Sequence, residues 1–535
     1  MSGTASPRSL QREEERAEEY GGDDPQDPLP KVDGKIPVPK DEAVDPNLVA
    51  WDGPHDPENP QNWTVARKWA LTTLGVLMAV NVTFASSAPS AATAAICAEF
   101  GVSDEVGYLI TSIFLCGYVV GPLLWGPGSE LYGRRVIFRL SLSCYVLLHL
   151  GQALAHNIET LLVTRFLCGV FACAPLTISG GLIVDMWDPI NRGKATALFS
   201  SGVFLGPVLG PTVGGFIIQS TLGWRWVFWV MMIFAGSCTV LAFAFLPETF
   251  APVLLQWKAR RLRKADPATN AQLYSQHERS DWSIRGILHR TVYRPVQMLI
   301  QEPVLLLVTL YMSLVYGVLY ALFEALPLIF VGTRGFDVAQ SGLIFIGVGI
   351  GTTIGAYLMV PTTRHYPALL VKWRGFPPPE ERLYGAMIGA PLLVVGSFWL
   401  GWSGNYPSVH WIVPALATIP IGASVALIFN SFLSYLVDTY LQYSASAFSA
   451  NTIIRSAVGA AFPLFTVQMF HRLGINWACT LIGFAGLLLA PSPFLFYRYG
   501  TWVRSKSKFS PSLDLVIAKE LEEEAAAAAK GVEKV

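Results

Sequence analysis

Long apolar runs separated by short polar loops make up most of this chain. A helix needs about 20 residues to cross the roughly 30 Å hydrocarbon core of a bilayer, and runs of about that length recur from residue 69 to residue 496. Their repetition predicts about twelve membrane-spanning helices. The expected spans are Trp69–Ser87, Gly107–Trp125, Val136–Leu154, Thr160–Ile183, Ala195–Gln219, Trp226–Leu246, Val304–Phe330, Gly342–Met359, Tyr384–Leu400, Trp411–Leu436, Phe448–Met469 and Ala478–Phe496.

One long charged segment divides these spans into six and six. We expect a cytoplasmic and largely disordered N-terminal tail over residues 1–66, a six-helix bundle over 67–246, a cytoplasmic linker over 247–302, a second six-helix bundle over 303–498 and a cytoplasmic C-terminal tail over 499–535. Two joined bundles are a common organisation among transporters built from repeats. The predicted fold class is therefore an all-α membrane protein.

Composition supports a bilayer as the solvent and narrows the function classes. Of 535 residues, 52% are hydrophobic and only 14% are charged, which is more apolar surface than one soluble core can bury. The formal net charge is +0, and no basic patch favours nucleic-acid binding. The sequence holds no Gly-x-x-x-x-Gly-Lys-Ser/Thr motif and no intramembrane spacing typical of a metal site or catalytic triad. We therefore expect neither an enzyme nor a bound cofactor or metal.

Lysines and arginines concentrate in the loops that follow even-numbered spans, whereas the opposite loops carry mainly Arg225, Arg334 and Arg472. Positive residues in short loops favour the cytoplasmic side. Both termini are therefore expected in the cytoplasm. The expectation is a monomeric, multi-pass protein of the plasma membrane whose partners are the lipid bilayer, a small-molecule substrate and protons.

A tight charged turn, Gly126–Arg135, joins the second and third spans. Gly126 and Gly133 would permit close backbone approach, and Glu130 is placed to cap a helix N-terminus or to pair with an arginine. Asp185, at the end of the fourth span, is the expected partner of Arg134. A solvated positive turn would explain the arginines alone.

The turn resembles the signature of the major facilitator superfamily, which reads roughly Gly-x-Leu-Ala-Asp-x-x-Gly-Arg-Arg, with Glu130 here in place of the Asp. The resemblance implies that this acid contacts the start of the eleventh helix, near residues 444–446, and that the charge cluster stabilises an outward-facing state. We interpret these residues as a conformational latch: Gly126, Glu130, Gly133, Arg134, Arg135 and Asp185.

Two charged residues, Arg165 and Glu324, lie inside apolar spans, where a charge is costly and often functional. Arg165 matches the family's second motif, whose arginine is implicated in proton transfer. Glu324 is hard to ionise in apolar surroundings, which suits a group that exchanges a proton. We interpret both as proton-coupling residues. The alternatives are an arginine that extends to the outer interface and a glutamate that faces lipid.

Small residues in the fifth span, from Gly206 to Gly215, would let another helix pack backbone to backbone. Their pattern, Gly-(three residues)-Gly-Pro-x-x-Gly-Gly, resembles the motif of the drug:proton antiporter branch. We interpret its key positions as Gly206, Gly210, Pro211, Gly214 and Gly215. Generic packing of small residues is the alternative.

Further segments resemble the fungal drug:proton antiporters with twelve transmembrane helices. They include Trp51-Asp52-Gly53-Pro54, Gly223-Trp224-Arg225-Trp226 and Leu246-Pro247-Glu248-Thr249, and the resemblance extends from about residue 51 to residue 498. It implies a major facilitator fold and proton-coupled efflux of drugs, polyamines, toxins or secondary metabolites.

Aromatic and amide side chains are the candidates for substrate binding. Tyr316, Tyr320 and Phe323 precede Glu324 at helical spacing and would present an aromatic face to an amphipathic or cationic ligand. The amide candidates are Asn81, Asn430 and Asn451. For each amide, an interhelical hydrogen bond is the alternative role.

Together these patterns predict a proton-coupled transporter that exports small amphipathic molecules, such as drugs, toxins or secondary metabolites, by alternating access. An importer or facilitator of a vitamin, polyamine or organic acid on the same fold is the alternative. A membrane receptor that binds without transport is a more distant one.

Overall fold

The computed structural model describes residues 45, 47–188, 192–279 and 282–532, so most of the predicted 1–66 tail lies outside the described residues. The described chain is helical. Its N-terminal helices are α2 (Val65–Ser87), α3 (Thr93–Phe100), α4 (Asp104–Tyr132), α5 (Arg134–Ala153), α6 (Ile158–Met186), α7 (Arg192–Gln219) and α8 (Arg225–Phe245). The remaining helices are α9 (Ala251–Ala265), α10 (Gln276–Arg279), α11 (Ile284–Leu288), α12 (Arg294–Gln301), α13 (Pro303–Pro327), α14 (Val338–Thr362), α15 (Tyr366–Lys372), α16 (Tyr384–Gly404), α17 (Ile412–Tyr440), α18 (Ser444–Leu489), α19 (Ser492–Arg504) and α20 (Leu513–Val532).

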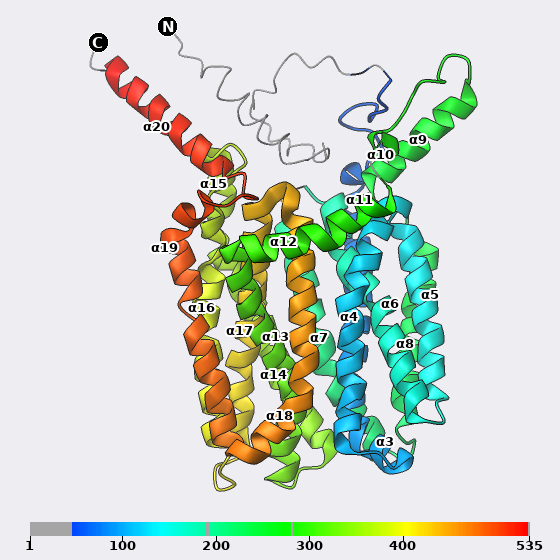
Figure 1. The fold of residues 1–535 in the computed structure, drawn as a ribbon, viewed down its shortest axis with the longest axis vertical. Coiled ribbons are helices and arrows are strands. Elements are labelled where there is room, and N and C mark those ends of the chain that lie inside the picture. Colours follow the sequence, from blue (N-terminus) through cyan, green and yellow to red (C-terminus); the bar gives the residue numbers. More distant parts are fainter. Residues whose placement is uncertain (1–44, 46, 189–191, 280–281, 533–535) are drawn as a thin grey trace.

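Within the described ranges, eleven segments are long and apolar enough to cross a membrane. The last of them, Ser444–Arg504, contains two helices joined at a kink where Gly474 adopts φ 77° and ψ 163°. Counting these two helices separately gives the twelve spans that the sequence predicts. Figure 1 shows the chain reversing direction at the foot of α18, with α2–α8 forming one bundle beside a second bundle of α13–α19.

The helices are buried on one side and apolar on the other, as a bilayer requires. Large side chains such as Leu147, Val240 and Leu488 are exposed on the outer surface, although they lie in apolar spans. Facing inward, Phe114 and Phe228 are fully buried. A soluble bundle would bury such outward leucines, so the exposed apolar surface is typical of a protein in contact with lipid.

A layer of short helices, α9–α12, lies at one end of the molecule, where α11 and α12 run across the bundles and α9 projects outward (Figure 1). The segment after Asp45 folds onto this layer: buried Lys258 of α9 contacts Asp52 at 2.7 Å and Asp56 at 3.3 Å. Backbone amides of Asp52 and Glu58 donate to the Asp56 carboxylate, and these bonds, with Lys258, hold the pKa of Asp56 below its usual 3.8. Part of the predicted tail is therefore docked on the linker.

The C-terminal segment is clamped to the same end of the molecule. Arg504 is almost fully buried and makes paired hydrogen bonds to the carboxylates of Glu380 and Asp514, at 2.8–2.9 Å. Nearby, buried Glu302 accepts hydrogen bonds from the backbone amides of Lys508 and Phe509. These contacts fix the chain as far as the start of α20, within the predicted 499–535 tail.

Candidate functional site

The glycines of α7 bring this helix against the backbone of α2. A Cβ atom added at Gly206 would lie 2.7 Å from the amide nitrogen of Phe84, and one at Gly210 would lie 2.7 Å from that of Ala88. At Gly214 the nearest atom would be the Ala88 carbonyl oxygen, at 2.6 Å. The structure therefore places three positions of the sequence motif at a backbone-to-backbone contact, which only glycine permits.

One further glycine of the motif contacts the other bundle. A Cβ atom at Gly215 would lie 2.8 Å from the carbonyl oxygen of Val338 on α14, and one at Gly342 would lie 2.6 Å from the carbonyl oxygen of Pro211. The Thr212 hydroxyl donates to the Gly342 carbonyl at 2.8 Å. The small-residue motif thus serves two interfaces, one inside the first bundle and one between the bundles.

The charged turn between α4 and α5 is organised around two acids. Arg134 Nε lies 3.3 Å from Asp185 Oδ2, and both side chains are largely buried. The Glu248 carboxylate accepts hydrogen bonds from the backbone amides of Arg134 and Arg135, at 2.9 and 3.0 Å. An anion at the exposed amides of a helix N-terminus is stabilising, so Glu248 caps α5.

Sequence reasoning did not assign a role to Glu248. The available signal was an acid immediately after an apolar span, in Leu246-Pro247-Glu248-Thr249. Gly133 is required beside it, because its φ is +91° and an added Cβ would lie 2.8 Å from the Glu248 carboxyl carbon. The expectation for Gly126 was wrong: a Cβ there would meet no atom within 4 Å, so this glycine serves no close approach.

Glu130 of the turn and Ser446 of α18 make contacts that the sequence did not predict. The backbone carbonyl of Glu130 accepts from His277 Nε2 at 2.9 Å, which ties the turn to α10. Ser446, at the expected contact point on α18, donates its hydroxyl hydrogen bond to the Arg290 carbonyl at 3.5 Å. Both contacts join the bundles to the layer of short helices.

Arg165 lies in the interior of the first bundle and is fully buried. Its guanidinium donates to the carbonyl oxygens of Ile110 and Ala85, each at 3.0 Å, and stands 4.3 Å from the Phe114 ring centroid. It does not extend to the outer interface. Arg165 thereby joins α6 to α4 and to α2, near the α2–α7 glycine contact.

Hydroxyl and aromatic groups join the bundles at the centre. Ser86 of α2 and Tyr320 of α13 share a hydrogen bond of 2.8 Å, and the Tyr316 hydroxyl lies 3.5 Å from that of Tyr320. The Phe204 ring of α7 packs edge-on against Phe429 of α17, with centroids 5.2 Å apart. The predicted aromatic residues of α13 therefore meet the first bundle.

Glu324, one helical turn after Tyr320, is also buried. Its Oε1 atom has no hydrogen-bond partner among the described residues, and Tyr108 of α4 lies within electrostatic range. The glutamate therefore faces protein and not lipid. Phe323 beside it is buried and contacts Phe345, with centroids 5.5 Å apart.

The three amide candidates have different surroundings. Asn81 is buried, and neither its oxygen nor its nitrogen finds a partner in the described part of the chain. Asn451 is buried too, but its amide lies 3.4 Å from Thr309 Oγ1 and Met312 Sδ, within its own bundle. Asn451 thus fits the interhelical alternative, whereas Asn81 stays a substrate candidate. Asn430 is half-buried on α17.

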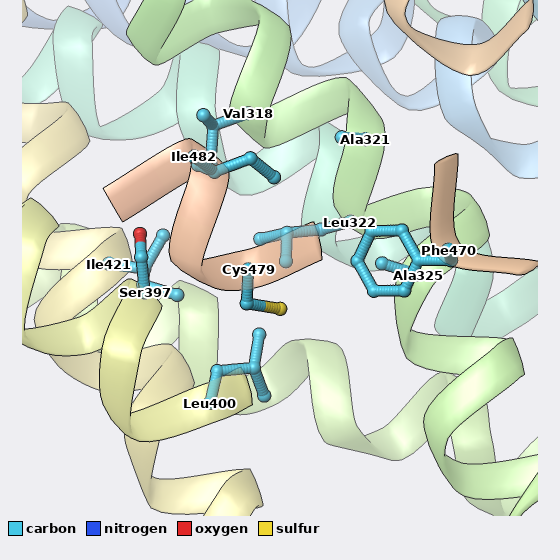
Figure 2. Close-up of a pocket in the computed structure, with 10 residues that line it drawn as sticks. All are labelled: Val318, Ala321, Leu322, Ala325, Ser397, Leu400, Ile421, Phe470, Cys479 and Ile482. Atoms are coloured by element: carbon cyan, nitrogen blue, oxygen red, sulfur yellow. The ribbon is translucent and has the colours of Figure 1, made fainter. Parts of the chain in front are cut away.

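The pocket in Figure 2 lies inside the second bundle, where Ala321 and Ala325 of α13 contribute to its lining. Val318, Leu322 and Phe470 line it together with Ser397, whose hydroxyl donates to the Leu393 carbonyl. Its walls carry no charged side chain. We assign this small apolar gap no ligand.

Comparison with known proteins places this architecture in a family. The profile described as Major Facilitator Superfamily matches residues 74–463. A "Citrinin biosynthesis cluster MFS transporter", mrr1, from Monascus ruber is 43% identical over 476 residues, which cover 88% of this chain and 94% of the relative. A "Major facilitator superfamily multidrug transporter", mdrA, from Aspergillus fumigatus is 39% identical over 478 residues, or 89% and 78% of the two chains.

A solved structure of the proton:xylose symporter XylE aligns with a TM-score of 0.60 at 16% identity, covering 85% of this chain and 100% of that one. This likeness concerns the fold, whereas the closer relatives are named as transporters and not as enzymes. Together, the profile, the relatives and the paired bundles show an integral, multi-pass transporter of small molecules, and the chain belongs to the major facilitator superfamily.

Proposed function

We propose that this protein exports small amphipathic molecules across the plasma membrane in exchange for protons, with both termini in the cytoplasm. The observation that carries the proposal is Glu324, a buried carboxyl group near the junction of the bundles whose Oε1 has no partner among the described residues. An unpaired acid in apolar surroundings is costly to ionise, so it can take up and release a proton during the cycle.

The direction of transport is supported by the relatives. One is named as a transporter of a biosynthesis cluster and the other as a multidrug transporter. Both names suit removal of a compound from the cytoplasm. From these names we extend to this chain only the removal of small molecules, and an amphipathic substrate is our own proposal.

Alternating access would use the contacts between bundles. The Gly215–Val338 and Gly342–Pro211 approaches close the end opposite the charged turn, and Ser86–Tyr320 closes the centre. In the outward-open state these contacts would separate, while the latch of Arg134, Arg135, Asp185 and Glu130 would hold the cytoplasmic end closed. Arg165, bonded to α2 and α4, would transmit a change at the centre to the first bundle.

Transport into inside-out vesicles tests the proposal. The vesicles are given an acidic lumen, and accumulation of carboxyfluorescein and of rhodamine is followed for the wild type, Glu324→Gln and the exposed control Glu105→Gln. We expect uphill accumulation of at least one dye by the wild type and the control. The Glu324→Gln variant should lose uphill accumulation but keep exchange of labelled for unlabelled dye.

Uphill accumulation that survives an uncoupler would contradict proton exchange. Accumulation that requires the opposite orientation of the vesicles would instead favour the importer. Full activity of Glu324→Gln would remove this residue from the coupling mechanism.

A further inference from the structure

Arg455 of α18 is a charged group at the centre of the molecule that the proposed function leaves unused. Its guanidinium carbon lies 4.8 Å from the ring centroid of Tyr316 and 5.1 Å from that of Phe429. The Phe429 ring packs against Phe204 of the other bundle, and Gly459, one helical turn further along α18, lies against Tyr316 and near Leu115 of α4. Arg455 therefore lies where the two bundles meet.

No acid in the described part of the chain neutralises this guanidinium. Among the described residues, Arg455 makes no ion pair, and its Nε atom, which is shielded from solvent, has no hydrogen-bond partner. The residue as a whole is half-buried, so an entering ligand can reach the guanidinium. Glu324 lies eight residues beyond Tyr316 on α13, about 12 Å along the helix axis, and its Oε1 atom has no hydrogen-bond partner in the described part of the chain. The other central charge, Arg165, is also positive.

The centre of the molecule thus carries an excess of positive charge. An unpaired arginine within a membrane is costly unless it meets a partner or water, and the faces of two aromatic rings compensate for only part of that cost. A permanent partner would be an acid on a neighbouring helix, and the described helices provide none there. A transported molecule is the remaining source of a counter-charge.

We propose that this site binds planar aromatic organic anions, with Arg455 binding their carboxylate between Tyr316 and Phe429. This proposal rests on the proposed transport function. A guanidinium binds a carboxylate through two parallel hydrogen bonds, which a lysine does not reproduce. Aromatic walls suit a flat ring system. The Ser86–Tyr320 hydroxyl pair, next to Tyr316, offers hydrogen bonds to further polar groups.

An anionic ligand differs from the cationic ligand that the aromatic side chains of α13 alone would favour. The Tyr316 and Phe429 faces, which would attract a cation, are already occupied by Arg455. A cationic ligand at the same rings would be repelled by the guanidinium, because like charges in a region of low dielectric interact strongly. The structure therefore selects for the opposite charge.

Equilibrium binding to the purified full-length protein tests the site without any gradient. The probes are naphthoate, its neutral methyl ester and the cation naphthylmethylammonium, followed by quenching of intrinsic tryptophan fluorescence. We expect the wild type to bind naphthoate about tenfold or more tightly than either analogue, as a charge-assisted hydrogen-bond pair implies. Arg455→Met should remove this preference, and Arg455→Lys should restore only part of it.

The control is Arg472→Met, at an exposed position just before the Gly474 kink of the same helix, which should leave the preference unchanged. Equal binding of acid and ester by the wild type, tighter binding of the cation, or no binding of naphthoate at millimolar concentration would each overturn the proposal, even if Arg455→Met fails to fold. If the vesicle experiment shows no proton coupling, the binding affinities measured here are not affected by that result. Failure of the proposed proton exchange is therefore distinguishable from failure of the anion site.

Discussion

The contact between α7 and α14 predicts that Gly342→Ala shifts the balance between closed and open states. The added methyl group would lie 2.6 Å from the Pro211 carbonyl oxygen and 3.1 Å from Thr212 Cα, whereas ordinary contacts begin at 3.4 Å. The helices must therefore separate by up to about 0.8 Å at this point, the difference between 3.4 and 2.6 Å. Such overpacking costs about 1–3 kcal/mol.

Because this cost falls only on states in which the bundles touch here, it should favour the open state about 5- to 150-fold. Electron–electron distance measurements between spin labels at Ser220 and Gly332, in a variant without native cysteines, report the opening. Gly210→Ala is the comparison: its methyl group clashes inside the first bundle, so it should lower stability without lengthening the distance. Gly236→Ala, with no neighbour within 4 Å, should change neither. An unchanged distance distribution in Gly342→Ala would refute the reasoning.

Three further changes have expected outcomes. Arg504→Met leaves two buried carboxylates unpaired and should lower the free energy of unfolding by about 3–5 kcal/mol, which is measured as a lower melting temperature. Its control is Arg374→Met, which removes an exposed ion pair and should lower the free energy of unfolding by less than about 1 kcal/mol. Equal losses of stability in the two variants would contradict the role of Arg504 as a clamp. Because the pKa of Asp56 is lowered in the folded protein, its contribution to docking of the segment after Asp45 on α9 is present above pH 3.8 and is lost as the pH falls through the lower folded-state value. Hydrogen exchange should therefore show this segment released from α9 in acid. In Asp56→Asn the same release should be seen at neutral pH. Glu248→Gln should raise exchange of the first α5 amides, and unchanged protection would argue against a charged cap.

The sequence predicted those features that depend on local pattern. The apolar runs located the spans, and the glycine spacing of α7 located a close helix contact, because both are set by residues near one another in the chain. The sequence did not predict that the glycine motif of α7 contacts two different helices, because α2 and α14 approach α7 from opposite sides and both are distant from it in the chain. Nothing in the residues around Gly215 identifies Val338 as its neighbour.

Roles that depend on a distant partner could not be predicted from the sequence. Glu248 caps a helix that begins 114 residues earlier, and only the folded chain brings the two together. Asn81 and Asn451 have the same chemistry and similar apolar surroundings, yet the first has no partner among the described residues and the second bonds to α13. Which face of a helix an amide occupies is decided by packing. Gly126, in contrast, fits the sequence motif but makes no close contact.

The sign of the charges at the centre constrains how proton and substrate can be exchanged. If an anion binds at Arg455, protonation of Glu324 removes a negative charge from the same region of the molecule. For two like charges about 12 Å apart at an effective dielectric constant near 20, the repulsion removed is about 1.4 kcal/mol, which favours the anion. The charge interaction between the proton on Glu324 and the anion at Arg455 would therefore favour binding of both together, as in cotransport. Exchange of the proton for the substrate must then depend on movement of the bundles. Glu324→Gln, which mimics the protonated acid, should bind naphthoate as tightly as the wild type or up to about tenfold more tightly, while losing uphill transport. A weaker affinity of Glu324→Gln for naphthoate would show instead that the Glu324 carboxyl group itself contacts the ligand, and would contradict a coupling that acts through charge at a distance.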